Sequence, residues 1–123
     1  MNVWLFIGAV NGFLGVAAGA FGAHGLESRV DARALEIFNT GAHYHLIHAL
    51  ATVAAASIAR GAAAGAARMA ALLFTAGVVF FSGSLYFMAL AGSNALVLAT
   101  PIGGVCFLAG WAMLAAAALK SQR

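Results

Sequence analysis

The sequence predicts an all-α integral membrane protein with four transmembrane helices in an antiparallel up-down bundle. Four stretches contain no Asp, Glu, Lys or Arg: 3–23, 42–59, 69–90 and 95–119. A helix needs about 20 apolar residues to cross the hydrocarbon core of a bilayer, and each stretch is close to that length. Hydrophobic residues make up 64% of the 123 residues and charged residues 7%, whereas soluble domains average about 25% charged residues. Transmembrane β-strands are excluded, because they would alternate polar and apolar residues.

Charge and cysteine content argue against a nucleic-acid interface, a disulfide and a cysteine metal site. The net charge of +3 comes from six basic and three acidic residues, which are too few and too scattered for a nucleic-acid interface. The single cysteine cannot form an internal disulfide, and no paired-cysteine metal motif is present. We therefore expect one transmembrane domain over residues 1–123, with the lipid bilayer as its main partner.

Glycines recur along the first span at alternating intervals of four and three residues. This 3.5-residue repeat places them on one seam of a gently supercoiled helix. Each glycine weakens a helix by about 0.8–1.0 kcal/mol relative to alanine, so the run indicates a compensating close contact between helices. That contact lies either within the chain or, on an unused seam, in a homo-oligomer. The predicted packing glycines are Gly8, Gly12, Gly15, Gly19 and Gly22, followed by Gly83 in the third span and Gly103 and Gly110 in the fourth.

The connection between the first two spans holds all three acidic residues of the chain. Ser28 followed by Asp31 resembles a helix start, where a side-chain oxygen caps free backbone amides. Residues 32–40 mix apolar and polar side chains, which indicates a short amphipathic helix at the membrane surface or an extension of the second span. The other links, 61–65 and 91–94, are short and turn-prone, so consecutive helices should be antiparallel neighbours.

Basic residues predict the orientation. Four crossings place both termini and the middle link on one side, which carries four basic residues against two on the other. The positive-inside rule then assigns both termini to the cytoplasm. Composition fits a bacterial cytoplasmic (inner) membrane and equally an organellar inner membrane. The four basic residues are Arg60, Arg68, Lys120 and Arg123, and the opposite pair is Arg29 and Arg33.

The same topology brings hydrogen-bonding side chains from four segments toward the outer surface. At about 1.5 Å of rise per residue, they should share one layer roughly 5–10 Å below that surface. The inner halves of the spans are almost purely apolar, with Asn11 as the main exception. The candidate ligand-binding residues are His24, Tyr44, His48, Ser82, Ser84, Tyr86 and Thr100.

Three interpretations of this polar layer compete. It is a hydrogen-bond network that fixes helix register, or a site for an amphiphile such as a quinone or lipid headgroup bound by His48 and Tyr86. The third is metal or haem ligation by His24 with His45 or His48, which ranks lower because the spans hold no carboxylate. No metal or other cofactor is therefore expected. Proton or ion transport ranks lower still, since it usually needs an intramembrane carboxylate.

Several strings resemble a known family. They are GAHGL at 22–26, FSGSLY at 81–86 and TPIGG at 100–104, with Tyr44 and His48 between the first two. This pattern is similar to the domain-of-unknown-function 423 family of small bacterial membrane proteins, to which animal transmembrane protein 256 is related. The resemblance implies four membrane helices and no assigned activity. His43 and His45 are not part of the family pattern, so the resemblance favours His24 and His48 as the functional histidines.

These observations predict a non-enzymatic protein. Ser84 and His48 lack an acid nearby in sequence, because all acids lie in the surface connection, so no catalytic residues are expected. The leading hypotheses are a binding module for a lipid- or quinone-like ligand and an accessory subunit of a larger membrane complex. The alternative is a self-associating structural protein whose polar layer only fixes helix register.

Overall fold

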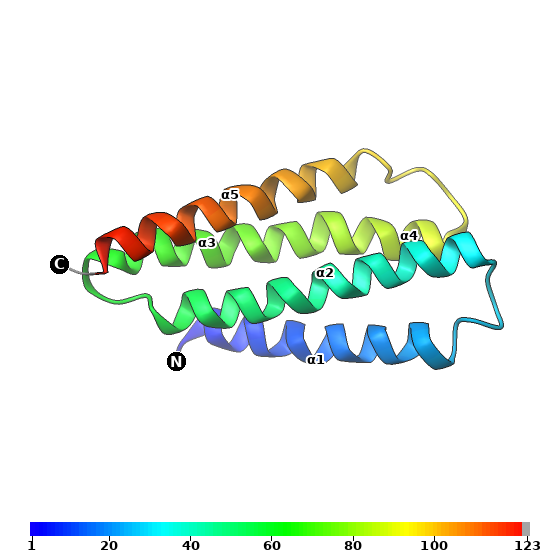
Figure 1. Cartoon of the computed structure of the whole chain (residues 1–123), viewed down its shortest axis with the longest axis horizontal. Helices are drawn as coiled ribbons and strands as arrows, with labels where there is room; N and C mark the ends of the chain where they lie inside the picture. Colours follow the sequence, from blue (N-terminus) through cyan, green and yellow to red (C-terminus); the bar gives the residue numbers. More distant parts are fainter. Residues whose placement is uncertain (122–123) are drawn as a thin grey trace.

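The computed structural model describes residues 1–121, and every regular element within this range is a helix (Figure 1). The all-helical class is therefore confirmed, whereas Arg123, counted in the predicted charge balance, lies outside the described residues. The helices are α1 (Val3–His24), α2 (Ala32–Ser57), the 3₁₀ turn η1 (Gly61–Ala63), α3 (Ala64–Gly77), the π-helical turn η2 (Val78–Ser82), α4 (Gly83–Ala91) and α5 (Ala99–Lys120).

Long rods lie side by side, and α3, η2 and α4 form one continuous rod (Figure 1). The N-terminus, the C-terminal end of α5 and the link between α2 and α3 lie at one end, and the other two links lie at the opposite end (Figure 1). The main neighbour of α1 is α2, and the main neighbour of α5 is α3. This leaves α2 as the inner helix that contacts both α1 and the α3–α4 rod.

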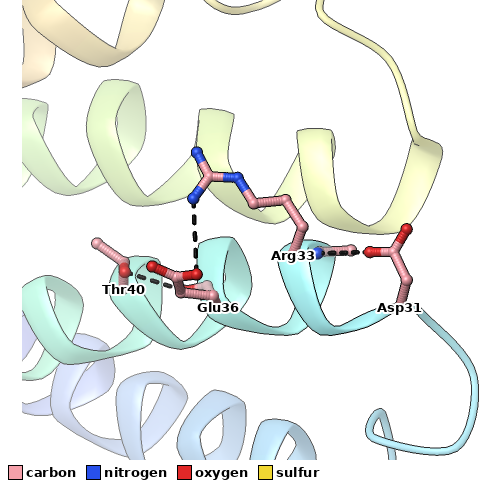
Figure 2. A network of polar contacts seen from close by, with 5 residues as sticks. Asp31, Arg33, Glu36 and Thr40 are labelled. Carbon is pink, nitrogen blue, oxygen red and sulfur yellow. Dashed lines mark hydrogen bonds and ion pairs between the residues drawn. The ribbon is translucent and has the colours of Figure 1, made fainter.

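The segment before the second predicted span extends α2 rather than forming a separate surface helix. The cap is Asp31, not Ser28, and its Oδ1 accepts a hydrogen bond from the Ala34 amide at 2.8 Å. Figure 2 shows this cap beside an Arg33–Glu36 pair, whose charged atoms lie 3.6 Å apart on side chains 74% and 70% exposed. An ion pair this exposed contributes little to stability. The capping carboxylate therefore fixes where α2 begins.

The other helix boundaries also differ from those predicted. Helix α3 begins at Ala64, five residues before the predicted start at 69, and α5 begins at Ala99 rather than 95. Gly92 ends α4 in a left-handed conformation (φ 62°), which only glycine adopts without strain, and the turn continues to residue 98. Pro101 then occupies the first turn of α5, where its missing amide costs no helical hydrogen bond.

Three of the predicted packing glycines on α1 meet α2 closely. A Cβ added at Gly8 would lie 3.0 Å from the Val53 amide nitrogen, and one at Gly15 would lie 3.3 Å from Leu46 Cα. Gly22 similarly lies against the side chain of Asn39. These glycines are seven residues apart, so they form one line along α1 at which the two backbones approach.

The remaining glycines divide between packed and open positions. Gly103 and Gly110 of α5 pack against the α3–α4 rod, where an added Cβ would lie 2.8 Å from Phe81 Cα and 2.7 Å from Phe74 Cδ1, respectively. In contrast, an added Cβ at Gly12 or Gly19 would meet nothing within 4 Å, and one at Gly83 would meet only its own rod at 4.0 Å. The packing prediction is therefore wrong within this chain for those last three. The α1 glycine seam is wider than the α1–α2 contact, and an added Cβ at Gly83 meets no other helix.

The core consists largely of small side chains. One cluster contains Ala51 and Ala55 of α2 with Ala70, Ala71 and Phe74 of α3. Alanine surfaces let these helices approach closely, as is typical of helix packing in lipid. By length and composition, α1, the rod Gly61–Ala91 and α5 are each able to cross a membrane, and α2 is not among these candidates.

Candidate functional site

A hydrogen-bonded chain of three side chains connects three helices at α2. The nitrogens of His45 lie 2.8 Å from the Tyr86 hydroxyl and 3.1 Å from Asn11 Oδ1. An amide oxygen only accepts, so His45 Nε2 carries the proton and donates to Asn11. In the neutral ring Nδ1 then accepts, and the Tyr86 hydroxyl donates to it. This chain connects α4, α2 and α1, and both ring nitrogens of His45 are hydrogen-bonded.

Both ring nitrogens of His48, one turn further along α2, also form hydrogen bonds. The indole nitrogen of Trp111 donates to His48 Nε2 at 3.1 Å, so the ring proton lies on Nδ1. Nδ1 donates in turn to the Tyr44 backbone oxygen at 2.8 Å. The imidazole stacks on Phe107, with ring centroids 3.6 Å apart and planes 9° apart. His48 therefore holds α5 against α2 and has no nitrogen free for a metal or ligand.

The hydroxyl groups near the π-helical turn form two further pairs. Ser82 Oγ donates to the Gly41 backbone oxygen at 2.7 Å and so joins η2 to α2. Ser84 Oγ donates to the Phe81 backbone oxygen at 2.8 Å and lies 2.6 Å from the Thr100 hydroxyl. Because Ser84 has one proton, Thr100 is the donor in that second bond. π-Helical turns are frequent at functional sites, and this one places two serines toward different neighbours.

The predicted polar residues do not share one layer. On α5, Thr100 bonds to Ser84 and Trp111 bonds to His48. These two α5 residues are 11 positions apart, which corresponds to about 16 Å along a helix, so Ser84 and His48 lie at different depths. His45 reaches Asn11 near the middle of α1, far from the end of that helix at His24. The single outer layer is therefore wrong: the polar groups form separate pairs distributed along the rods, because side chains bond to the nearest facing helix.

The histidines that join the helices differ from those that the sequence analysis favoured. His24 is exposed at the last position of α1 and makes no side-chain hydrogen bond among those found in residues 1–121. His45, which the family resemblance disfavoured, is buried and bonded to Tyr86. Its position on the same α2 face as His48 (i, i+3) was the available signal. Asn11, Phe107 and Trp111 also contribute contacts beyond the predicted site.

An open groove runs between α2 and α5 over the π-helical turn. Its volume is about 450 Å³, and aromatic rings form most of its walls. Tyr44 and Phe81 have ring centroids 4.8 Å apart, and Phe81 and Phe107 have centroids 5.4 Å apart. The lining residues are His43, Tyr44, Ile47, His48, Phe81, Gly104, Phe107, Leu108 and Trp111.

Two polar groups at this groove differ from the buried ones. Tyr44 is 40% exposed, and neither its hydroxyl nor the exposed His43 ring makes a hydrogen bond to any other residue within 1–121. In the same range, every buried side-chain nitrogen and oxygen has a partner, and no group of three metal-ligating side chains is found. Free hydrogen-bonding capacity is therefore concentrated at the outward-facing side of α2.

A model of the family described as "protein of unknown function (DUF423)" matches residues 18–104. This chain belongs to that family. The matched range includes the seven predicted site residues, whereas Asn11, Phe107 and Trp111 lie outside it. The recognition made from the sequence strings is confirmed.

Relatives cover almost the whole chain. The UPF0382 membrane protein YwdK of Bacillus subtilis is 41% identical, over 98% of both chains. A UPF0382 membrane protein of Haemophilus influenzae is 43% identical over 98% of this chain and 97% of its own length. The UPF0382 inner membrane protein YgdD of Escherichia coli is 37% identical over 97% of this chain and 91% of its own. This DUF423 chain is thus a helical membrane protein, and no solved structure matches it.

Proposed function

We propose that the chain crosses the membrane four times, with α2 as the fourth crossing beside the three recognised by hydropathy. At 26 residues, α2 is about 39 Å long, which exceeds the roughly 30 Å of the hydrocarbon core. Its hydropathy is lowered by histidines, but His45 and His48 are buried and hydrogen-bonded to other helices. Polar side chains paired inside a bundle are compatible with lipid outside.

We propose further that both termini lie in the cytoplasm of a bacterial cell and that the membrane is the cytoplasmic one. Figure 1 places the N-terminus, the C-terminal end of α5 and the link between α2 and α3 at the same end, which carries Arg60, Arg68 and Lys120. Arg29 and Arg33 lie in or next to the link at the other end. A phosphatase reporter fused to the C-terminus should be inactive, and an active fusion would reverse this orientation.

The function that the geometry supports best is non-enzymatic binding of an amphiphile in the groove between α2 and α5. The observation that carries this proposal is the Tyr44 hydroxyl at an aromatic groove: it has no hydrogen-bond partner within residues 1–121, whereas every buried polar side-chain atom in that range has one. A hydroxyl facing lipid without a partner is costly, so a ligand acceptor would stabilise it. His48, predicted as a ligand group, accepts a hydrogen bond from the wall residue Trp111, and Tyr86, the other predicted ligand group, bonds to His45 outside this groove.

A quinone is the ligand class that matches these walls. Its flat ring can stack against Tyr44 and Phe107, its carbonyl can accept from the Tyr44 hydroxyl, and its chain can extend into lipid. A lipid headgroup could use the same donors but would gain little from aromatic walls. The chain would then act as a binding module, alone or as an accessory subunit of a membrane complex.

Tryptophan quenching tests the proposal directly, because Trp111 lines the groove. In a Trp4→Phe background Trp111 is the single tryptophan, and decylubiquinone should quench it saturably in detergent micelles. Tyr44→Phe should weaken binding by about tenfold, the equivalent of one lost hydrogen bond of about 1.4 kcal/mol. Gly104→Leu should abolish it by filling the groove, since an added Cβ there meets no atom within 4 Å and leaves the fold intact.

The matched control is Gly12→Leu, an equally open position on α1 outside this groove. It should leave the quenching curve unchanged. Quenching that rises linearly with quinone and is identical in all variants would overturn quinone binding. A stable protein partner on native gels would then favour the accessory-subunit hypothesis.

A further inference from the structure

A second groove runs along the α1–α2 interface. It consists of two adjoining hollows of about 540 and 410 Å³, which share Val16 and Leu46 as lining residues. Gly12 lines the first and Gly19 the second, and neither glycine would bring an added Cβ within 4 Å of another atom. The two α1 glycines that do not pack against α2 thus form the floor of one continuous channel.

The lining of the channel changes from apolar to partly polar along its length. The part around Gly12 is lined entirely by apolar residues and glycine. The part around Gly19 also contains Asn39 and His43, which are exposed and donate no side-chain hydrogen bond to another residue within 1–121. Asn39 and His43 lie toward the end of the molecule that holds the link between α1 and α2. The channel is therefore amphipathic, with its polar end toward one membrane surface.

Its length matches one leaflet. From Gly8 to Ala20 the lining positions of α1 span 12 residues, or about 18 Å at 1.5 Å per residue. Half of a bilayer hydrocarbon core is about 15 Å. An acyl chain lying in the apolar part would thus place the headgroup of its lipid beside Asn39 and His43.

The shape favours a flexible chain over a second copy of this protein. Val16, 59% exposed, lies one turn beyond Gly12 and separates it from Gly19, and Leu50, 71% exposed, rises from α2 at the channel side. A partner helix would meet these side chains before its backbone reached the glycines, whereas close backbone approach is what small-residue interfaces require. A single file of methylene groups can bend around Val16 and fill the channel.

We propose that this channel retains one phospholipid, with an acyl chain over Gly12 and Gly19 and the headgroup hydrogen-bonded by Asn39 and His43. The site is distinct from the quinone groove, although His43 and Ile47 line both. The bound lipid would be part of the α1–α2 interface, which otherwise relies on the glycine contacts at positions 8, 15 and 22.

Native mass spectrometry of delipidated protein, titrated with palmitoyl-oleoyl phosphatidylethanolamine, tests this proposal. The wild type should bind one phospholipid per chain. Gly12→Leu and Gly19→Leu should each weaken binding at least about tenfold, the equivalent of two displaced methylene groups. Asn39→Leu should weaken it less, since the acyl contacts remain. Ala17→Leu, on the same helix but outside the channel, is the matched control and should bind like the wild type.

Three results would overturn the proposal: no retained phospholipid in the wild type, equal binding by Gly12→Leu and Ala17→Leu, or a change from dimer to monomer in Gly12→Leu without loss of lipid. The last result would assign the channel to a second copy. Gly104→Leu should keep the phospholipid while losing decylubiquinone quenching, so failure of one site can be told apart from failure of the other.

Discussion

Polar side chains on the two sides of α2 differ in whether they form hydrogen bonds within the protein. On the side facing α1, α4 and α5, His45 and His48 use both ring nitrogens in hydrogen bonds. On the outward side, His43 and the Tyr44 hydroxyl make no such bond within residues 1–121 and line open grooves. Adjacent residues of one helix thus differ: the inner set joins helices by hydrogen bonds, and the outer set keeps free hydrogen-bonding groups, which we propose bind a molecule from the membrane.

The largest contrast is expected between two adjacent glycines of α5. Gly103 packs against the Phe81 backbone, which cannot move aside, whereas Gly104 faces the open groove. Gly103→Leu should cost about 3 kcal/mol or more through overpacking, and Gly104→Leu should change the free energy of unfolding by no more than about 1 kcal/mol. Thermal unfolding of both variants in the same detergent measures the difference. Equal stabilities would mean that α5 does not pack on the π-helical turn in this way.

The next contrast is between histidines two positions apart. His45→Leu leaves the Tyr86 hydroxyl and the Asn11 amide without partners, which should cost about 1–3 kcal/mol. His43→Leu should stay within about 0.5 kcal/mol of the wild type. Unfolding in sodium dodecyl sulfate measures both. A double-mutant cycle of His45→Leu with Tyr86→Phe should give a coupling energy of about 0.6–1.7 kcal/mol, and additive effects would show that the bond is not formed.

A smaller effect is expected from removing the indole donor to His48. Trp111→Phe keeps an aromatic ring but leaves His48 Nε2 without its donor, at a cost of about 0.6–1.7 kcal/mol. Nitrogen NMR of histidine-labelled protein provides a direct check, because His48 should carry its proton on Nδ1 and His45 on Nε2. The reverse assignment at His48 would exclude the Trp111 bond.

The smallest effect on stability is expected for a substitution of Tyr44, on the outward side of α2. Tyr44→Phe removes a hydroxyl that bonds to no other residue in the described part of the chain, so the free energy of unfolding should change by less than about 0.5 kcal/mol. The same unfolding assay applies, now repeated with decylubiquinone. Stabilisation of the wild type by the quinone, but much less of Tyr44→Phe, would separate a binding role from a structural one. A large loss of stability without ligand would indicate an unrecognised internal partner.

Much of the architecture could be predicted because it depends on local composition. Charge-free apolar runs indicated the helices, and the short turn-prone links indicated which helices are neighbours. The start of α5 was predicted four residues early because residues 95–98 are as apolar as a helix, and hydropathy does not register the turn begun at Gly92. The π-helical turn had no sequence signal, since its extra residue is accommodated by packing against α2 and α5.

The candidate site was only partly predictable. Polarity selected Tyr44, His48, Ser82, Ser84 and Tyr86, all of which lie at helix contacts or at the α2–α5 groove. Residue type did not reveal which of them are already paired. That depends on which side chain faces which across an interface.

Apolar length and the absence of charge act residue by residue, so they are enough to predict that this chain is helical and lies in a membrane. The contacts between helices determine that His45 rather than His24 is part of the hydrogen-bonded core, and that Gly12 and Gly19 stay open while Gly8 and Gly15 pack. These outcomes depend on how each rod is rotated about its axis. Helical periodicity defines the faces of each rod, but contacts with neighbouring helices select which face is buried.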